Sequence, residues 1–318
     1  MVDVLGVIPY RSPAFNRKWF LRVFEKLHTA CLFLGHPSTK IVIHPSRDRA
    51  TIHQDGCEIP LEARYYVYLP PSYERQHTGL AKIRRSRYQD FVSREWDVVT
   101  QFLEEHLIDS AKCVNPPLSA RRAANKLLQL VSAKPHGLDI PPTVVTNSAQ
   151  EAIKILPPGS SRGLWKPIGE SGNITSDLMA PASLFTRAEL LADPASIEIA
   201  PGCFQRFIAA KRELRTYIFG ARAVSILIRP RDKISTPDLT CQNLEEDDFS
   251  RTEGFKDHES KLIGLVKDLG LRYAAVDSII AGQRRYFLEV NPNGGWGWLP
   301  KDMQAPLDHE FRQLVLDR

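Results

Sequence analysis

The stretch Arg284-Arg-Tyr-Phe-Leu-Glu-Val-Asn-Pro-Asn-Gly-Gly-Trp-Gly-Trp298 carries the most informative pattern in the chain. Residues 286–291 alternate as a strand does, so we expect Glu289 and Asn291 to share one face with Phe287. A carboxylate and an amide oxygen two residues apart on a rigid strand suit Mg²⁺, which takes few protein ligands and lets substrate phosphates supply the rest.

A second acid lies shortly before this strand. The run Tyr273-Ala-Ala-Val-Asp-Ser-Ile-Ile280 also reads as a strand, and the short connection with a glycine predicts a hairpin. If the loop is the three residues Gly282 to Arg284, Asp277 lies directly opposite Glu289 on the same face. The same pattern is compatible with a solvated hairpin, but the following Pro292-Asn-Gly-Gly lets backbone approach a ligand closely.

The order Asp277…Glu289-Val-Asn291-Pro-Asn-Gly resembles the metal-binding signature of the ATP-grasp superfamily of carboxylate-amine ligases. The longer Phe-Leu-Glu-Val-Asn-Pro-Asn-Gly-Gly-Trp resembles one branch, the ribosomal-peptide maturases of the microviridin (graspetide) type. This resemblance implies an α+β ATP-grasp fold with an N-terminal α/β domain, ATP and Mg²⁺ as cofactors, and Asp277, Glu289 and Asn291 as metal ligands.

Composition fits an ordinary globular protein: 318 residues, 43% hydrophobic and 25% charged. The five cysteines are scattered and contain no Cys-x-x-Cys pair, so neither a disulfide framework nor a zinc site is indicated, and we expect them to be reduced and buried. No histidine pattern indicates a hydrolase triad. No apolar run is long enough to cross a bilayer, and the N-terminus is unlike a signal peptide, which predicts a cytoplasmic protein with no membrane contact.

The net charge of +5 favours acidic ligands such as nucleotides and Asp- or Glu-rich peptides. The basic run Lys82-Ile-Arg-Arg-Ser-Arg87 lacks interleaved aromatic residues, so we interpret it as a solvated loop and expect no nucleic-acid partner.

The first part of the chain, residues 1–114, mixes strands and helices, as an α/β domain does. Helical spacing of apolar residues predicts one helix within 17–34 and another over 96–107. Strands are expected near 3–9, 40–44 and 64–70, and a hairpin about Gln54-Asp-Gly56.

Asn115-Pro-Pro marks a boundary, and Ser119 to Ala133 then reads as one helix with Ser119 as its N-cap. By pattern alone a helical lysine is a surface residue. The stretch resembles the entry to the ATP-grasp fold, which implies that Lys126 reaches the nucleotide phosphates.

Gly163-Leu-Trp-Lys-Pro-Ile-Gly169-Glu-Ser-Gly172 places a lysine ahead of a Gly- and Ser-rich turn, where backbone N–H groups can hold phosphate oxygens. A plain hairpin with a chance lysine is the other interpretation. The resemblance implies that Lys166 contacts the α- and β-phosphates and that Gly169 to Gly172 form a lid.

Phe204 to Ile208 resembles the linker strand that holds adenine, with Gln205 and Phe207 as nucleotide contacts. Glu213-Leu-Arg215-Thr-Tyr217 alternates, so these three polar side chains share a face. Without the resemblance, Glu213 and Arg215 read as a surface ion pair. The resemblance implies that Glu213 accepts hydrogen bonds from ribose and that Arg215, with Lys166 and Arg229, assists the chemistry.

The implied parts are residues 1–114 as the N-terminal domain, 115–200 as the lid subdomain and 201–318 as the subdomain with the nucleotide and metal site. The implied activity joins an Asp or Glu side chain of a precursor peptide to a hydroxyl or amine through an acyl phosphate, in an enzyme compatible with a homodimer. Two alternatives stay open: an ATP-grasp ligase that adds an amino acid to a peptide or small acid, and a non-catalytic nucleotide-binding scaffold.

Overall fold

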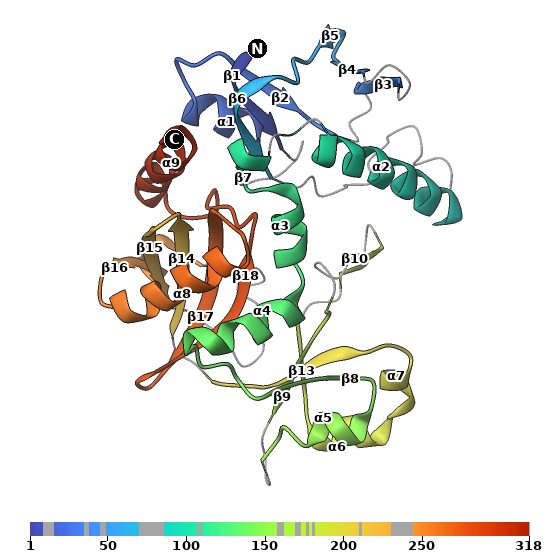
Figure 1. The fold of residues 1–318 in the computed structure, drawn as a ribbon. Coiled ribbons are helices and arrows are strands. Elements are labelled where there is room, and N and C mark those ends of the chain that lie inside the picture. The colour runs from blue at the N-terminus through green and yellow to red at the C-terminus, as the bar shows by residue number, and fades with distance from the viewer. Residues whose placement is uncertain are drawn as a thin grey trace. The chain divides into compact units, whose positions relative to one another are not determined.

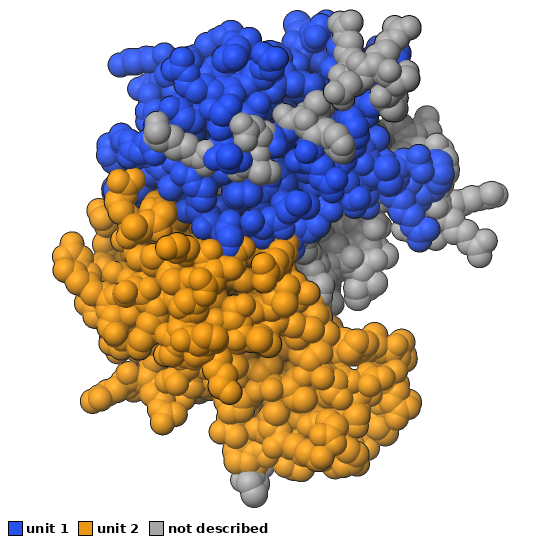
Figure 2. Space-filling model, viewed as in Figure 1, with its two compact units in different colours: residues 1–121, 270–273, 292–318 blue, residues 122–269, 274–291 orange. Residues whose placement is uncertain are grey.

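The computed structural model describes residues 1–8, 16–34, 38–44, 49–69, 86–106, 108, 110–157, 162–168, 173–175, 178–179, 182–209, 212–229 and 244–317. These residues form two compact units, the first built from residues 1–121, 270–273 and 292–318 and the second from 122–269 and 274–291 (Figure 2). The three-part division expected from the sequence has other boundaries, since it groups 292–318 with 201–291, and it stays a prediction.

The first unit is an α/β layer around a parallel sheet in the order β2-β1-β6-β7 (Figure 1). Its elements are β1 (Val2–Val7), α1 (Arg17–Val23), β2 (Thr29–Leu32), β3 (Lys40–His44), β4 (Arg49–Gln54), β5 (Cys57–Glu58), β6 (Ala63–Tyr68), α2 (Ser86–His106), β7 (Cys113–Val114), α3 (Pro117–Ala123) and α9 (Lys301–Leu316). The α/β character expected of the N-terminal part is confirmed.

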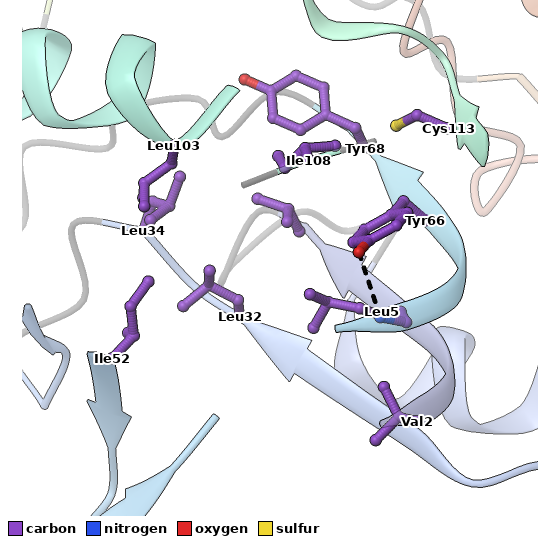
Figure 3. Close-up of a cluster of buried hydrophobic side chains, with 12 residues drawn as sticks. Val2, Leu5, Leu32, Leu34, Ile52, Tyr66, Tyr68, Leu103, Ile108 and Cys113 are labelled. Carbon is purple, nitrogen blue, oxygen red and sulfur yellow. Dashed lines mark hydrogen bonds between the residues drawn. The ribbon is translucent and has the colours of Figure 1, made fainter. Parts of the chain in front are cut away.

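Apolar side chains from β1, β2, β4, β6 and β7 and from α2 form a buried core beside this sheet (Figure 3). Leu5 and Leu32 are buried beside Leu103 of α2. Tyr66 turns its hydroxyl back to accept a hydrogen bond from the Ala63 N–H at 3.2 Å, which satisfies a polar atom inside the cluster.

A second cluster in the first unit is aromatic. Trp19 and Trp296 meet edge to face at 5.8 Å between ring centroids, and Phe311 of α9 lies 5.5 and 5.7 Å from them. Asp308 accepts hydrogen bonds from both indole N–H groups, at 2.9 and 3.0 Å. Trp296 is therefore a packing residue, whereas Trp298 is 45% exposed.

The second unit contains two larger antiparallel sheets, in the orders β12-β9-β13-β8 and β16-β15-β14-β17-β18. Their strands are β8 (Thr143–Thr146), β9 (Gly163–Lys166), β12 (Ser183–Phe185), β13 (Gly202–Arg206), β14 (Arg212–Phe219), β15 (Arg222–Ile228), β16 (Phe249–Thr252), β17 (Tyr273–Ala281) and β18 (Arg284–Asn291). The remaining elements are α4 (Lys126–Ala133), α5 (Ala149–Ile153), β10 (Asn173–Thr175), β11 (Leu178–Met179), α6 (Arg187–Ala192), α7 (Ala195–Glu198) and α8 (Lys256–Asp268).

The structure corrects three helices expected from the sequence. The helix in 17–34 ends at Val23, and β2 takes the place of its second half. The helix expected over 96–107 starts ten residues earlier, at Ser86. The single helix 119–133 is two helices, α3 and α4, because Asn125 caps α4 by accepting from the N–H groups of Leu127 and Leu128. Ser119 lies within α3 and is no N-cap.

The expected hairpin about Gln54-Asp-Gly56 is confirmed. Asp55 and Gly56 form the expected β4–β5 turn with φ of 53° and 82°, which is the reason for an Asp-Gly pair there. Ser148 caps α5 by accepting from the Glu151 N–H. Cys57, however, is exposed, contrary to the expectation that the cysteines are buried, because β5 is an edge strand of a small sheet.

Candidate metal and nucleotide site

The hairpin of β17 and β18 pairs Asp277 with Glu289, as expected. The loop is shorter than expected, since Ala281 pairs with Arg284 and leaves only Gly282 and Gln283 in the turn. A register shift compensates: Ser278 pairs with Phe287 and the next pair is Asp277 with Glu289, so Leu288 is an extra, bulged residue. Bulges re-aim side chains next to active sites.

The bulge also corrects the predicted faces of β18. Asp277 and Ser278 are neighbours on β17 and point to opposite faces of the sheet. Phe287, opposite Ser278, therefore lies on the face of α8, where the His258 imidazole contacts the Ser278 hydroxyl at 3.0 Å. Glu289 lies on the other face, so the expectation that it shares a face with Phe287 is wrong.

Glu289, Asn291 and Asp277 converge on this second face. The Asn291 Nδ2 lies 2.8 Å from Asp277 Oδ2 and 3.3 Å from Glu289 Oε1. Arg215, on the neighbouring strand β14, donates from one terminal nitrogen to both Asp277 oxygens at 2.8 and 2.7 Å. An acid pair, an amide and a guanidinium thus meet on three adjacent strands.

Lys126 reaches the same group from α4. Its Nζ lies 3.5 Å from Glu289 Oε2. The Asn125 cap starts α4 at this residue, so the lysine is the first residue of the helix rather than a member of a longer one. Sequence pattern alone favoured a surface position, and the break between α3 and α4 is what brings the side chain to the acid.

Lys166 is the last residue of β9 and pairs with Cys203 of β13. Its charge acts on the pKa of Asp277, of Glu289 and of the Cys203 thiol, so it belongs to the same electrostatic group. Glu213 is buried on β14, two residues before Arg215 and on its face.

The remaining candidates are less directly placed. Gln205 is buried on β13 and donates to the Thr143 hydroxyl at 2.9 Å, and the Phe207 N–H donates to the Arg162 carbonyl at 3.1 Å. Arg229 is exposed just after β15, and no contact among the described residues joins its side chain to the acids. Gly169 and Gly172 lie outside the described residues.

The electrostatics distinguish the two acids. Burial raises the pKa of the Asp277 carboxyl, although the Arg215 guanidinium acts against it. Burial also acts to raise the pKa of Glu289, but Lys126, Lys166 and the Asn291 amide outweigh it and hold this pKa below its usual value. Three cationic side chains thus face two carboxylates, and the positive balance suits a polyanion such as a nucleotide phosphate chain.

The donor set fits Mg²⁺. Among the described residues, no group of three or more His, Cys, Asp or Glu side chains could hold a metal ion by itself. Two carboxylates and one amide are instead the small, all-oxygen set that leaves positions for phosphate oxygens and water. The Asn291 amide already turns toward both acids, and a half-turn about its last bond exchanges nitrogen for oxygen there.

Solved structures of other proteins have the same fold as this chain. No protein-family model and no curated protein matches the sequence. The macrocyclase MdnC bound with precursor peptide MdnA, from Microcystis aeruginosa MRC, matches with a TM-score of 0.80 at 20% identity over 100% of both chains. The chain has the ATP-grasp fold.

Two further ATP-grasp structures agree. A Chryseobacterium gregarium RiPP-associated ATP-grasp ligase, in complex with ADP and a leader and core peptide, has a TM-score of 0.80 at 18% identity and covers 100% of this chain and 97% of its own. The ATP-grasp ligase PsnB, complexed with minimal precursor, Mg and ADP, has a TM-score of 0.70 at 17% identity over 98% and 96%. The ATP-grasp architecture expected from the sequence is confirmed.

Sequence reasoning missed one buried polar residue beside the candidate metal ligands. Gln129 lies between Leu128 and Leu130 in a run interpreted as a single helix, and it is only 2% exposed, whereas Leu128 is 37% exposed. A glutamine flanked by leucines on a helix that precedes the candidate metal-binding strand is a weak signal, because nothing local shows which face is buried.

Proposed function

We propose that this chain is an ATP-dependent ligase that activates a carboxylate as an acyl phosphate and joins it to a hydroxyl or amine. The observation that carries the proposal is the convergence of Asp277, Glu289 and Asn291 with Arg215 and Lys126 on one sheet face. These residue types in this arrangement suit the binding and neutralisation of a triphosphate. A non-catalytic scaffold has no need of an acid pair surrounded by cations.

The chemistry requires two displacements. An oxygen of the substrate carboxylate attacks the γ-phosphorus of ATP, the bond from that phosphorus to the bridging oxygen breaks, and ADP leaves. The acceptor hydroxyl or amine then attacks the acyl carbon, inorganic phosphate leaves, and the acceptor proton passes to solvent or phosphate. Both steps gain from positioning and from charge stabilisation at the phosphoryl group.

Named residues supply these effects in the proposal. Asp277, Glu289 and Asn291 would hold Mg²⁺, which when bound neutralises phosphate charge. Lys126 and Lys166 balance the remaining charge of the phosphate chain. Arg215 offers planar donors to the phosphoryl group that moves, a role that suits guanidinium better than ammonium. Glu213, Gln205 and Phe207 are proposed as nucleotide contacts, and Arg229 as a weaker candidate for substrate or phosphate.

The substrate class proposed is a ribosomally made precursor peptide, cross-linked through Asp or Glu side chains to Lys, Ser or Thr. The similar structures contain precursor, leader or core peptides, and the net charge of +5 favours an acidic one. A homodimer is proposed with it and is tested by sedimentation. Among the described residues no helix has the length and apolar character needed to cross a bilayer.

The test uses synthetic peptides that carry Asp and Glu beside Ser, Thr and Lys, incubated with ATP and Mg²⁺. We expect ADP release coupled to peptides that have lost one water per cross-link, detected by mass spectrometry. Matched peptides with Asn and Gln in place of the acids should give neither. A product enlarged by a free amino acid would instead support the amino-acid-adding ligase, and ADP release without any condensed product would contradict the proposal.

A further inference from the structure

The side chain of Gln129 makes three hydrogen bonds inside the second unit. Its Nε2 donates to the Val290 carbonyl and to the Ala123 carbonyl, each at 2.7 Å, and its Oε1 accepts from the Val290 N–H at 2.8 Å. The side-chain amide thus binds both backbone groups of one residue of β18. It acts there as a neighbouring strand would, at the open edge of the sheet.

Val290 is the residue between Glu289 and Asn291. In an antiparallel strand, successive residues direct their backbone groups to opposite sides. Glu289 and Asn291 pair with Asp277 and Ala275 of β17, whereas the Val290 groups face Gln129. The segment that carries two candidate metal ligands is therefore held from both sides, directly after the bulge at Leu288.

The same helix turn carries Lys126. The Gln129 N–H donates to the Asn125 carbonyl at 3.1 Å, which is the first hydrogen bond of α4. Lys126, between these two residues in the chain, places its Nζ 3.5 Å from Glu289 Oε2. The contact that fixes the edge of β18 thus also fixes the start of the helix against that strand.

We infer that Gln129 is a positioning residue for the candidate metal site, because it sets the backbone of Glu289 and Asn291 and the approach of Lys126. This inference rests on the proposed function. Gln129 itself touches neither acid, so its effect on metal binding passes through Val290. An amide that only stabilised the fold would change stability without changing how Mg²⁺ affects nucleotide binding.

The experiment titrates a non-hydrolysable ATP analogue with and without Mg²⁺. Gln129→Met keeps the side-chain volume and removes all three hydrogen bonds, and Gln129→Asn shortens the amide as a milder change. Ser225→Ala is the matched control, since Ser225 is also buried and hydrogen-bonded, to Thr216 and Glu259, on the opposite face of the same sheet. Urea unfolding shows which variants are folded, and it measures the stability that each variant loses so that variants of equal stability can be compared.

We expect the Mg²⁺-dependent part of analogue binding to weaken by about 10- to 100-fold in the Gln129 variants, the range seen when groups that orient metal ligands are removed. Binding without Mg²⁺ should weaken by no more than the roughly tenfold expected for loss of Lys126 alone, and Ser225→Ala should keep the full Mg²⁺ effect. Hydrogen exchange of the peptide that contains Val290 should speed up in the Gln129 variants.

The outcomes separate this inference from the proposed function. If the wild-type chain binds the analogue more tightly with Mg²⁺ and the Gln129 variants do too, the positioning role is wrong and the metal site stands. If Ser225→Ala loses the Mg²⁺ effect equally, the role is structural only and the inference is wrong. If the wild type shows no Mg²⁺ effect, the metal site itself is wrong and the inference fails with it.

Discussion

Replacing His258 should remove a defined part of the loss of stability in acid. His258 is 4% exposed on α8, behind the strand that carries Asp277, and its ring contacts the Ser278 hydroxyl at 3.0 Å. Burial, and to a lesser degree Arg285 and Lys261, lower its pKa from 6.5 to about 4, while Asp257 acts in the opposite direction. The imidazole is therefore neutral in the folded chain near pH 7.

The lowered pKa of His258 determines the direction in which stability changes with pH. As the pH falls below 6.5, the unfolded chain takes up this proton first, so the contribution to stability is full above pH 6.5 and is lost progressively down to pH 4. At pH 5 the loss from this one group is ~2 kcal/mol, and below pH 4 it approaches ~3 kcal/mol.

The assay is urea unfolding followed by circular dichroism at pH 7 and pH 5. Between these pH values His258→Gln should lose ~2 kcal/mol less than the wild type, whatever its stability at pH 7. Ser225→Ala removes a buried hydroxyl from the same side of the sheet without removing a titrating group, and it should lose as much as the wild type. Equal pH dependence in His258→Gln and wild type would refute a buried neutral imidazole.

Three further predictions concern packing and the site. A Cβ at Gly163 would lie 2.0 Å from the Phe185 ring, so Gly163→Ala should destabilise the second unit by about 1–3 kcal/mol in urea unfolding, and an unchanged midpoint would contradict this packing. Lys126→Met should weaken analogue binding about tenfold with little change in unfolding, and unchanged affinity would remove it from the phosphate site. Arg215→Lys keeps the charge but loses the paired donors, so ADP formation should fall about 100-fold; near-normal turnover would contradict its proposed role.

The sequence predicted the essential pairing of the hairpin but not the way in which the chain achieves it. Alternation and a glycine-containing turn predict that Asp277 lies opposite Glu289, and the structure pairs these two residues. The sequence pattern indicated neither the two-residue turn nor the bulge at Leu288. Each changes the register by one residue, and the two changes cancel at the pair of Asp277 and Glu289. They do not cancel beyond it, so the face of Phe287 was predicted wrongly.

Helix ends and buried polar groups were harder to predict. A single apolar stripe over 119–133 hides the break at Asn125, since the asparagine that caps α4 looks like any polar residue on a helix. The burial of Gln129 depends on β18, more than 150 residues away in the chain, as its bonds to Val290 span 161 positions. Such contacts have no local signal.

The most direct test of an ATP and Mg²⁺ site at Asp277, Glu289 and Asn291 is a calorimetric titration of the purified chain with a non-hydrolysable ATP analogue, with and without Mg²⁺, beside Asp277→Asn. Binding should strengthen with Mg²⁺ in the wild type and should lose this gain in Asp277→Asn. Absence of binding, or a Mg²⁺ effect that survives the substitution unchanged, would contradict the assignment of this site to ATP and its metal.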